Sequence, residues 1–148
     1  MGEEADIEVL LGSWDEFGQE ARRIRFEVFV AEQRVPAELE IDSVDPLCVH
    51  ALARCAGAFV GTGRLLPDGH IGRMAVLRSA RGKGVGRLLL MSLMEAARDR
   101  GDVQVELHSQ AHACGFYERF GFEAIGPQFD DAGIPHVTMR ARLASDRG

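Results

Sequence analysis

Short runs in which hydrophobic and polar residues alternate recur along the chain, separated by turns rich in glycine, proline and acidic residues. Such alternation is typical of strands with one buried face. The strong turn signal Pro67-Asp68-Gly69 predicts that the runs on either side of it form an antiparallel hairpin. The predicted strands are Ile7–Leu11, Leu47–Arg54, Ala58–Leu66, His70–Leu77, Val103–Leu107, Phe122–Ile125 and Pro135–Leu143.

Two longer segments have the helical period instead. The first begins at the capping-box pair Ser13 and Glu16 and is predicted to run to about residue 30, and the second covers about residues 86–100. A short helix is expected after Ser109. The order β-α-β-β-β-α-β-α-β-β then predicts an α/β fold, with one domain over residues 1–148 and a mixed central β-sheet flanked by helices on both faces. Segments 32–46 and 126–135 are predicted to be irregular.

The composition restricts the class of protein. The chain has 148 residues, of which 46% are hydrophobic and 27% charged, as expected for one globular domain. Its formal net charge of −6 argues against nucleic-acid binding. The sequence has neither a long apolar run nor a signal-peptide pattern, so we expect a cytoplasmic protein that does not bind membranes. Cys48, Cys55 and Cys114 are widely spaced, which indicates free thiols and no metal site.

A basic, glycine-rich segment joins the predicted strand 70–77 to the next helix. It reads Arg81-Gly82-Lys83-Gly84-Val85-Gly86 and is followed by Arg87. Glycines let the backbone turn tightly and approach a ligand, and the first N–H groups of a helix attract anions. The spacing differs from that of the P-loop and of the dinucleotide-binding fingerprint. The segment therefore predicts a diphosphate site, and the alternative is a surface loop whose basic residues only aid solubility.

The same segment resembles a signature of the GNAT acetyltransferase family. Arg81, Gly84 and Gly86 match its Arg/Gln-x-x-Gly-x-Gly/Ala loop, which holds the diphosphate of acetyl-CoA. Residues 110–122, QAHACGFYERFGF, resemble the second signature of the family, Asn-x-x-Ala-x-x-x-Tyr-x-x-x-Gly-Phe, with Gln110 in place of asparagine. The two signatures occur in the order found in the family, and the resemblance covers roughly residues 5–143.

Two further segments, 25–33 and 133–139, resemble the ElaA-like branch of small-molecule N-acetyltransferases. The resemblance implies that acetyl-CoA is the co-substrate and that a small-molecule amine is the acceptor. Homodimers are common in the family. The residues that the resemblance assigns to acetyl-CoA binding are Met74, Ala75, Val76, Arg81, Gly82, Lys83, Gly84, Val85, Gly86, Arg87 and Gln110.

Transfer of an acetyl group to an amine requires a base for the amine, polarisation of the thioester carbonyl and a proton for the leaving thiolate. Tyr117, the one tyrosine of the chain, occupies the general-acid position of the family. His136 resembles a histidine that serves as the base in some members. The other candidates for the base are His112, His50 and His108, or Glu27, Glu32 and Glu106 acting through water. Cys114 lies near Tyr117 in the sequence, which leaves a covalent route open beside direct transfer.

The acceptor is less well defined by the sequence. Arg25, Arg73 and His112 are predicted to bind it, and an arginine at the site would select an acceptor with an acidic group. The acidic segment 32–46 is either a solvated loop or a wall whose carboxylates attract a cationic amine. Two other functions remain as alternatives. One is a protein N-acetyltransferase, and the other is a non-catalytic acyl-CoA-binding module that acts through a partner and has no need of Tyr117 or His136.

Overall fold

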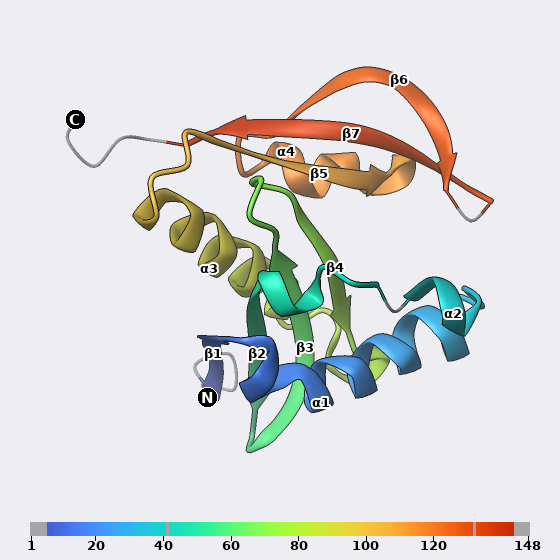
Figure 1. Ribbon diagram of the computed structural model, residues 1–148. Helices are drawn as coiled ribbons and strands as arrows, with labels where there is room; N and C mark the ends of the chain where they lie inside the picture. Colours follow the sequence, from blue (N-terminus) through green and yellow to red (C-terminus); the bar gives the residue numbers. More distant parts are fainter. Residues whose placement is uncertain (1–5, 41, 132, 144–148) are drawn as a thin grey trace.

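The computed structural model describes residues 6–40, 42–131 and 133–143. Seven strands form two antiparallel sheets within that part of the chain (Figure 1). The first sheet has the order β1-β2-β3-β4 and contains β1 (Ile7–Gly12), β2 (Val49–Cys55), β3 (Ala58–Leu65) and β4 (Ile71–Val76). The second has the order β5-β7-β6 and contains β5 (Gln104–Gln110), β6 (Glu123–Asp131) and β7 (Ile134–Arg142).

The α/β class is confirmed, and the structure shows how the expected mixed sheet is divided. Within the described residues, the parallel component is a single bridge between His70 and Glu106, at the start of β4. There the N–H of Glu106 donates to the carbonyl of Gly69 at 3.1 Å. Beyond this bridge β4 and β5 are no longer paired with each other, although they remain neighbours. The two sheets therefore meet at one end of β4 and separate toward its other end.

Two helices cover opposite faces of the first sheet. The helix α1 (Trp14–Arg25) begins at the predicted capping box, in which the N–H of Ser13 donates to Glu16 and the N–H of Glu16 donates to Ser13. Ala21 and Ile24 of α1 pack against Leu52 of β2. The helix α3 (Val85–Asp99) packs Leu89, Leu90, Leu93 and Ala97 against the other face, where Ala51 and Ala53 point. Successive residues of a strand face opposite sides of the sheet. Ala51 and Ala53 therefore face α3, and Leu52 faces α1.

Three predicted segments differ in the structure. The first predicted helix ends as α1 at Arg25 and continues as a π-helix, η2 (Phe26–Glu32). The segment predicted to be irregular contains α2 (Ala37–Glu40) and η3 (Asp45–Leu47). The prediction of a turn-rich segment over 126–135 is wrong for its first part, because β6 extends to Asp131 with a register shift between Ile125 and Phe129. An edge strand tolerates Pro127 there because the missing N–H of a proline matters least at an edge.

The remaining elements are short. The turn η4 (Arg78–Ala80) leads from β4 to the glycine-rich segment, and η5 (Ala111–Ala113) with α4 (Cys114–Glu118) follows β5. The hairpin predicted at Pro67-Asp68-Gly69 is confirmed, since the N–H of Leu66 donates to the carbonyl of His70 at 2.8 Å. Within the described residues, no helix is long and apolar enough to cross a membrane.

Candidate active site

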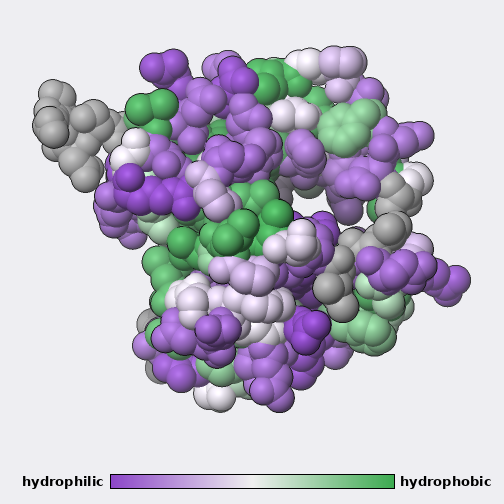
Figure 2. Space-filling model, viewed as in Figure 1, coloured by the Kyte–Doolittle hydropathy of each residue, from purple (hydrophilic) through white to green (hydrophobic). Residues whose placement is uncertain are grey.

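A cavity of about 570 Å³ lies where the two sheets separate. Its walls come from β4, from β5 and β7, and from the segment that follows α1. In the view of Figure 2 the surface is hollowed between the two halves of the molecule, which are otherwise covered mainly by hydrophilic residues. The cavity brings together five of the predicted site residues, which are Arg73, Met74, Gln110, Tyr117 and His136.

The middle of β4 is irregular where it borders the cavity. Thr62 of β3 is opposite Ala75, and Arg64 is opposite Gly72, so Arg73 and Met74 together face the single residue Gly63. Arg73 has a φ of +50°, in the left-handed region that non-glycine residues rarely adopt. These are the features of a β-bulge, which redirects backbone and side chains at functional sites.

Gly63 leaves room for this bulge. A Cβ atom at position 63 would lie 2.9 Å from Leu93 Cδ1 and 3.1 Å from Met74 Cγ. Both distances are shorter than ordinary van der Waals contacts, so a side chain at position 63 would displace Leu93 and Met74. The bulge therefore packs closely against Gly63 and α3. It lies at the start of the segment Met74 to Val76, where the thioester is predicted to bind.

Tyr117 is placed at the cavity by α4. Its ring packs edge-on against Phe116 and Phe122, with centroid separations of 5.0 and 6.0 Å. Burial raises the pKa of the Tyr117 phenol above its usual value, and the neighbouring thiol of Cys114 adds to the increase. The phenol is therefore fully protonated at neutral pH, which is the form that a general acid needs.

His136 also lines the cavity, from the start of β7. It is opposite Gln110 of β5 and Phe129 of β6 in the sheet register, and its ring stacks on Phe129 at 6.0 Å. His136 Nδ1 lies 2.8 Å from the carbonyl oxygen of Ile134. A carbonyl oxygen only accepts hydrogen bonds, so Nδ1 carries the proton, and in the neutral ring Nε2 has a lone pair. That tautomer is the one that a general base requires.

The other candidate bases are arranged differently. His112 is exposed, and its Nε2 pairs with the Gln110 side chain at 2.8 Å, so the structure does not bring it to the cavity. His50 is buried beside Trp14 and bonded to the carbonyl of Asp45, and burial lowers the pKa of His50. His108 does border the cavity, as does His70, which the sequence did not single out. None of the carboxylates Glu27, Glu32 and Glu106 lines the cavity within the described residues.

The glycine-rich segment begins the helix α3 as predicted. Gly82 and Gly84 have φ values of +81° and +89°, and the space around both is open, so the backbone here is accessible to a ligand. Gly84 is the N-cap, and Val85, Gly86 and Arg87 form the first turn, whose N–H groups have no partners within the helix. Lys83 and Arg87 are exposed beside them. Anions bind favourably at such a helix terminus.

Arg81 is engaged in this structure. Its Nε donates to the carbonyl of Val76 at 2.9 Å, and its two terminal nitrogens donate to the Glu32 carboxylate at 2.6 and 2.7 Å. The Arg81 guanidinium, with a smaller contribution from Arg78, lowers the pKa of Glu32. The signature arginine therefore links the diphosphate loop to η2, the segment that leads into the cavity wall.

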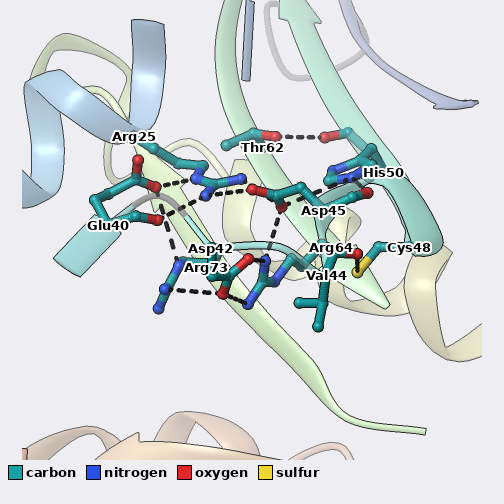
Figure 3. Close-up of polar contacts among 11 residues, drawn as sticks. Arg25, Glu40, Asp42, Val44, Asp45, Cys48, His50, Thr62, Arg64 and Arg73 are labelled. Carbon is teal, nitrogen blue, oxygen red and sulfur yellow. Dashed lines mark hydrogen bonds and ion pairs between the residues drawn. The ribbon is translucent and has the colours of Figure 1, made fainter. Parts of the chain in front are cut away.

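Arg25 does not reach the cavity. Its side chain is 1% exposed and is bonded to Glu40 and to both carboxylate oxygens of Asp45, each at 3.0 Å (Figure 3). The predicted role of Arg25 in acceptor binding is therefore not supported by its position. Asp42 and Asp45 of the acidic segment pair with arginines, and the pKa values of both carboxyls are lowered.

The acidic partners of these arginines were not predicted from the sequence. Glu40 is 5% exposed, Asp45 is 2% exposed, and Glu40 borders the cavity. A signal was present, because Arg25 lies at helical spacing from Ala21 and Val28 on the buried stripe of α1. A buried arginine needs a carboxylate partner, and the acidic segment 38–45 was the nearest source.

Comparison with known proteins identifies the family. The model of the acetyltransferase (GNAT) domain matches residues 15–143. The chain therefore belongs to the GNAT acetyltransferase family and is an acetyltransferase. The family uses acyl-CoA as the donor and amines as acceptors.

Individual relatives agree with this assignment. The chain is 39% identical over 125 residues to the N-acetyltransferase YjcF of Bacillus subtilis, covering 82% of this chain and 89% of that protein. The crystal structure of an acyl-CoA N-acyltransferase from Pseudomonas aeruginosa is similar with a TM-score of 0.83 at 30% identity, covering 91% and 99% of the two chains. The structure of Escherichia coli ElaA has a TM-score of 0.81 at 30% identity, with the same coverage.

Proposed function

We propose that this protein transfers the acetyl group of acetyl-CoA directly to the primary amine of a small metabolite. The observation that carries the proposal is the cavity at the end of the paired part of β4, which both Tyr117 and His136 line. Two proton-transferring groups of complementary type thus border the strand at which the family resemblance places the thioester. A binding module has no need of such an arrangement.

The donor is proposed to lie along β4 and the start of α3. The N–H groups of Val85, Gly86 and Arg87 and the charges of Arg81 and Lys83 suit a diphosphate. Backbone groups of residues 74–76 would pair with the pantetheine arm and polarise the thioester carbonyl. Gln110 offers an amide side chain on the opposite strand, although it is already within 2.8 Å of His112.

The proposed roles of the two side chains balance the reaction. His136 Nε2 accepts a proton from the amine, whose nitrogen forms the new bond to the acetyl carbon. As the carbon–sulfur bond breaks, the electron pair leaves on sulfur, and the Tyr117 hydroxyl donates its proton to that sulfur. Cys114 does not line the cavity, which favours direct transfer over a covalent enzyme intermediate.

A small acceptor is favoured by the size of the cavity. A volume of about 570 Å³ is typical of a small-molecule site. Arg73 is the one predicted acceptor-binding arginine that borders the cavity, with 30% of its side chain exposed. An acceptor that carries a carboxylate beside its amine would meet this guanidinium.

A thiol-release assay tests the proposal. Acetyl-CoA is offered with a panel of amino acids, other small amines and peptides, and released CoA is measured with wild-type protein. We expect turnover with small amines, highest for those with an acidic group. Turnover with peptides alone would identify a protein N-acetyltransferase. Tight acetyl-CoA binding without turnover on any amine would contradict the proposal and favour the binding module.

A further inference from the structure

Six buried or half-buried charged side chains form a closed ring in which arginines and carboxylates alternate (Figure 3). Asp42 accepts two hydrogen bonds from Arg64, at 2.8 and 2.9 Å, and Arg64 also donates to Asp45 at 2.7 Å. Arg73 completes the ring, since its Nη2 donates to Asp42 at 3.3 Å and its Nε lies 4.0 Å from Glu40. In order, the members are Arg25, Glu40, Arg73, Asp42, Arg64 and Asp45.

The ring joins distant parts of the chain behind the cavity. Its arginines come from α1, β3 and β4, and its carboxylates come from the segment between η2 and β2. Three positive and three negative charges cancel, which suits a site with little access to water. Arg73 is the only ring member with a left-handed backbone, and it occupies the bulge of β4.

A left-handed arginine is strained, and strained residues persist only where the surroundings hold them. Two of the contacts of Arg73 constrain its side chain and its backbone. The guanidinium is bound by Asp42 and approached by Glu40, and the backbone bulge is seated against Gly63, where no Cβ is present. Without the first contact the strand can relax toward regular pairing with β3.

We propose that Asp42 is a positioning residue, which acts through Arg73 to hold the peptide group between Arg73 and Met74 in the orientation that the thioester carbonyl requires. This inference rests on the proposed function, in which residues 74–76 polarise that carbonyl. It assigns the guanidinium of Arg73 a conformational role in addition to any contact with the acceptor. The N–H of Met74 is then the backbone donor whose direction depends on Asp42.

Glycine and alanine at position 73 separate the two roles of the arginine. Both substitutions remove the guanidinium and leave the same carboxylates without it. Glycine adopts φ near +50° without strain, whereas alanine, like arginine, adopts it only at a cost. We therefore expect Arg73→Gly to keep the bulge although the ring of ion pairs is broken. Arg73→Ala is expected to lose the bulge as well. Loss of acceptor binding would affect both variants equally.

The first test is kinetic and uses the wild-type protein, Arg73→Gly, Arg73→Ala and Asp42→Asn. We expect kcat to fall at least about tenfold in Asp42→Asn. We also expect the kcat of Arg73→Ala to lie at least about tenfold below that of Arg73→Gly, because both variants lack the same contact with the acceptor. The KM for acetyl-CoA should change little in all three. In an Arg73→Gly background, Asp42→Asn should cause no further loss of kcat. Equal losses in Arg73→Gly and Arg73→Ala would overturn the proposal.

The second test does not need an acceptor. The amide resonance of Met74 is compared between the CoA and acetyl-CoA complexes by ¹H–¹⁵N NMR. We expect a difference in the wild type and in Arg73→Gly that shrinks by about half or more in Arg73→Ala. A Met74 amide that does not respond to the acetyl group in the wild type refutes this inference. The thiol-release panel still decides the proposed function, so the two failures are distinguishable. The thermal midpoint of each variant shows that it is folded.

Discussion

Arg81 and Glu32 form a two-pronged ion pair between the diphosphate loop and the π-helical segment η2, with nitrogen–oxygen distances of 2.6 and 2.7 Å. The pair joins residues that are 49 positions apart in the sequence. It connects the expected cofactor site to the wall of the acceptor cavity, because Phe29 and Gln33, on either side of Glu32, line that cavity. The Glu32 carboxylate is therefore bound to the guanidinium of Arg81, which the family signature assigns to cofactor binding.

We expect Glu32→Gln to strengthen acetyl-CoA binding, because the substitution releases Arg81 for the diphosphate. The dissociation constant, measured by isothermal titration calorimetry, should fall by up to about fivefold, since an exposed pair is a weak competitor. Glu20→Gln is the matched control, because Glu20 pairs with Arg23 on the exposed face of α1. Weaker acetyl-CoA binding in Glu32→Gln would show instead that the pair positions Arg81 for its ligand.

His136→Ala should reduce kcat about 10²-fold or more, because the amine loses its proton acceptor. The space left by the ring can admit free imidazole, so added imidazole should restore part of the activity. His136→Phe provides the matched comparison, since the phenyl ring fills that space and leaves no room for imidazole. Activity that persists undiminished in His136→Ala would assign the base elsewhere, with His108 the next candidate at the cavity.

The ion pair with Arg64 should make the stability of the protein depend on pH. Hydrogen bonding to Arg64 lowers the pKa of Asp42 from 3.8 to about 2. The folded pKa is therefore below the unfolded one, so the contribution is present above pH 3.8 and is lost as the pH falls toward 2. Asp42 is one-third exposed, which reduces the expected contribution to about 1 kcal/mol.

Thermal unfolding of Asp42→Asn between pH 2 and 7 measures this contribution. We expect the midpoint of the variant to lie about 2–4 °C below that of the wild type at pH 7. The two curves should converge as the pH approaches 2. A constant difference across the range would mean that the carboxylate charge of Asp42 contributes nothing to stability.

Gly63→Ala should destabilise the fold by about 1–3 kcal/mol, because the added methyl group meets Leu93 and Met74 in a packed region. Urea unfolding measures the change in the free energy of unfolding. Gly115→Ala is the control, since the space around Gly115 is open and alanine favours the helix α4. A Gly63→Ala protein as stable as the wild type would show that the bulge of β4 adjusts without cost.

Much of the fold followed from local patterns in the sequence. The capping box of Ser13 and Glu16 set the start of α1, and the turn at Pro67-Asp68-Gly69 set the β3–β4 hairpin, because both signals involve neighbouring residues. The division into two sheets could not be predicted in this way. It depends on where the β4–β5 pairing stops, at the His70–Glu106 bridge, and that is decided by contacts between distant segments.

The candidate site was likewise predicted only where its residues are neighbours in the sequence. The signatures that contain Arg81 and Tyr117 were visible in the sequence because each is contiguous. The ring of ion pairs could not be predicted from the sequence, since Arg25, Asp42 and Arg73 come from separate elements and only the fold brings them together. His136 was selected by resemblance, whereas the orientation of its ring toward Ile134 is a property of the folded strand.

The central claim is that the cavity between the two sheets is where the acetyl group is transferred, with Tyr117 as the acid. The most direct measurement is the single-turnover rate of Tyr117→Phe with acetyl-CoA and the best amine of the panel, beside the dissociation constant for acetyl-CoA. The account predicts a rate about 10²-fold or more below that of the wild type, with a dissociation constant within about twofold. An unchanged rate with the hydroxyl removed would contradict it.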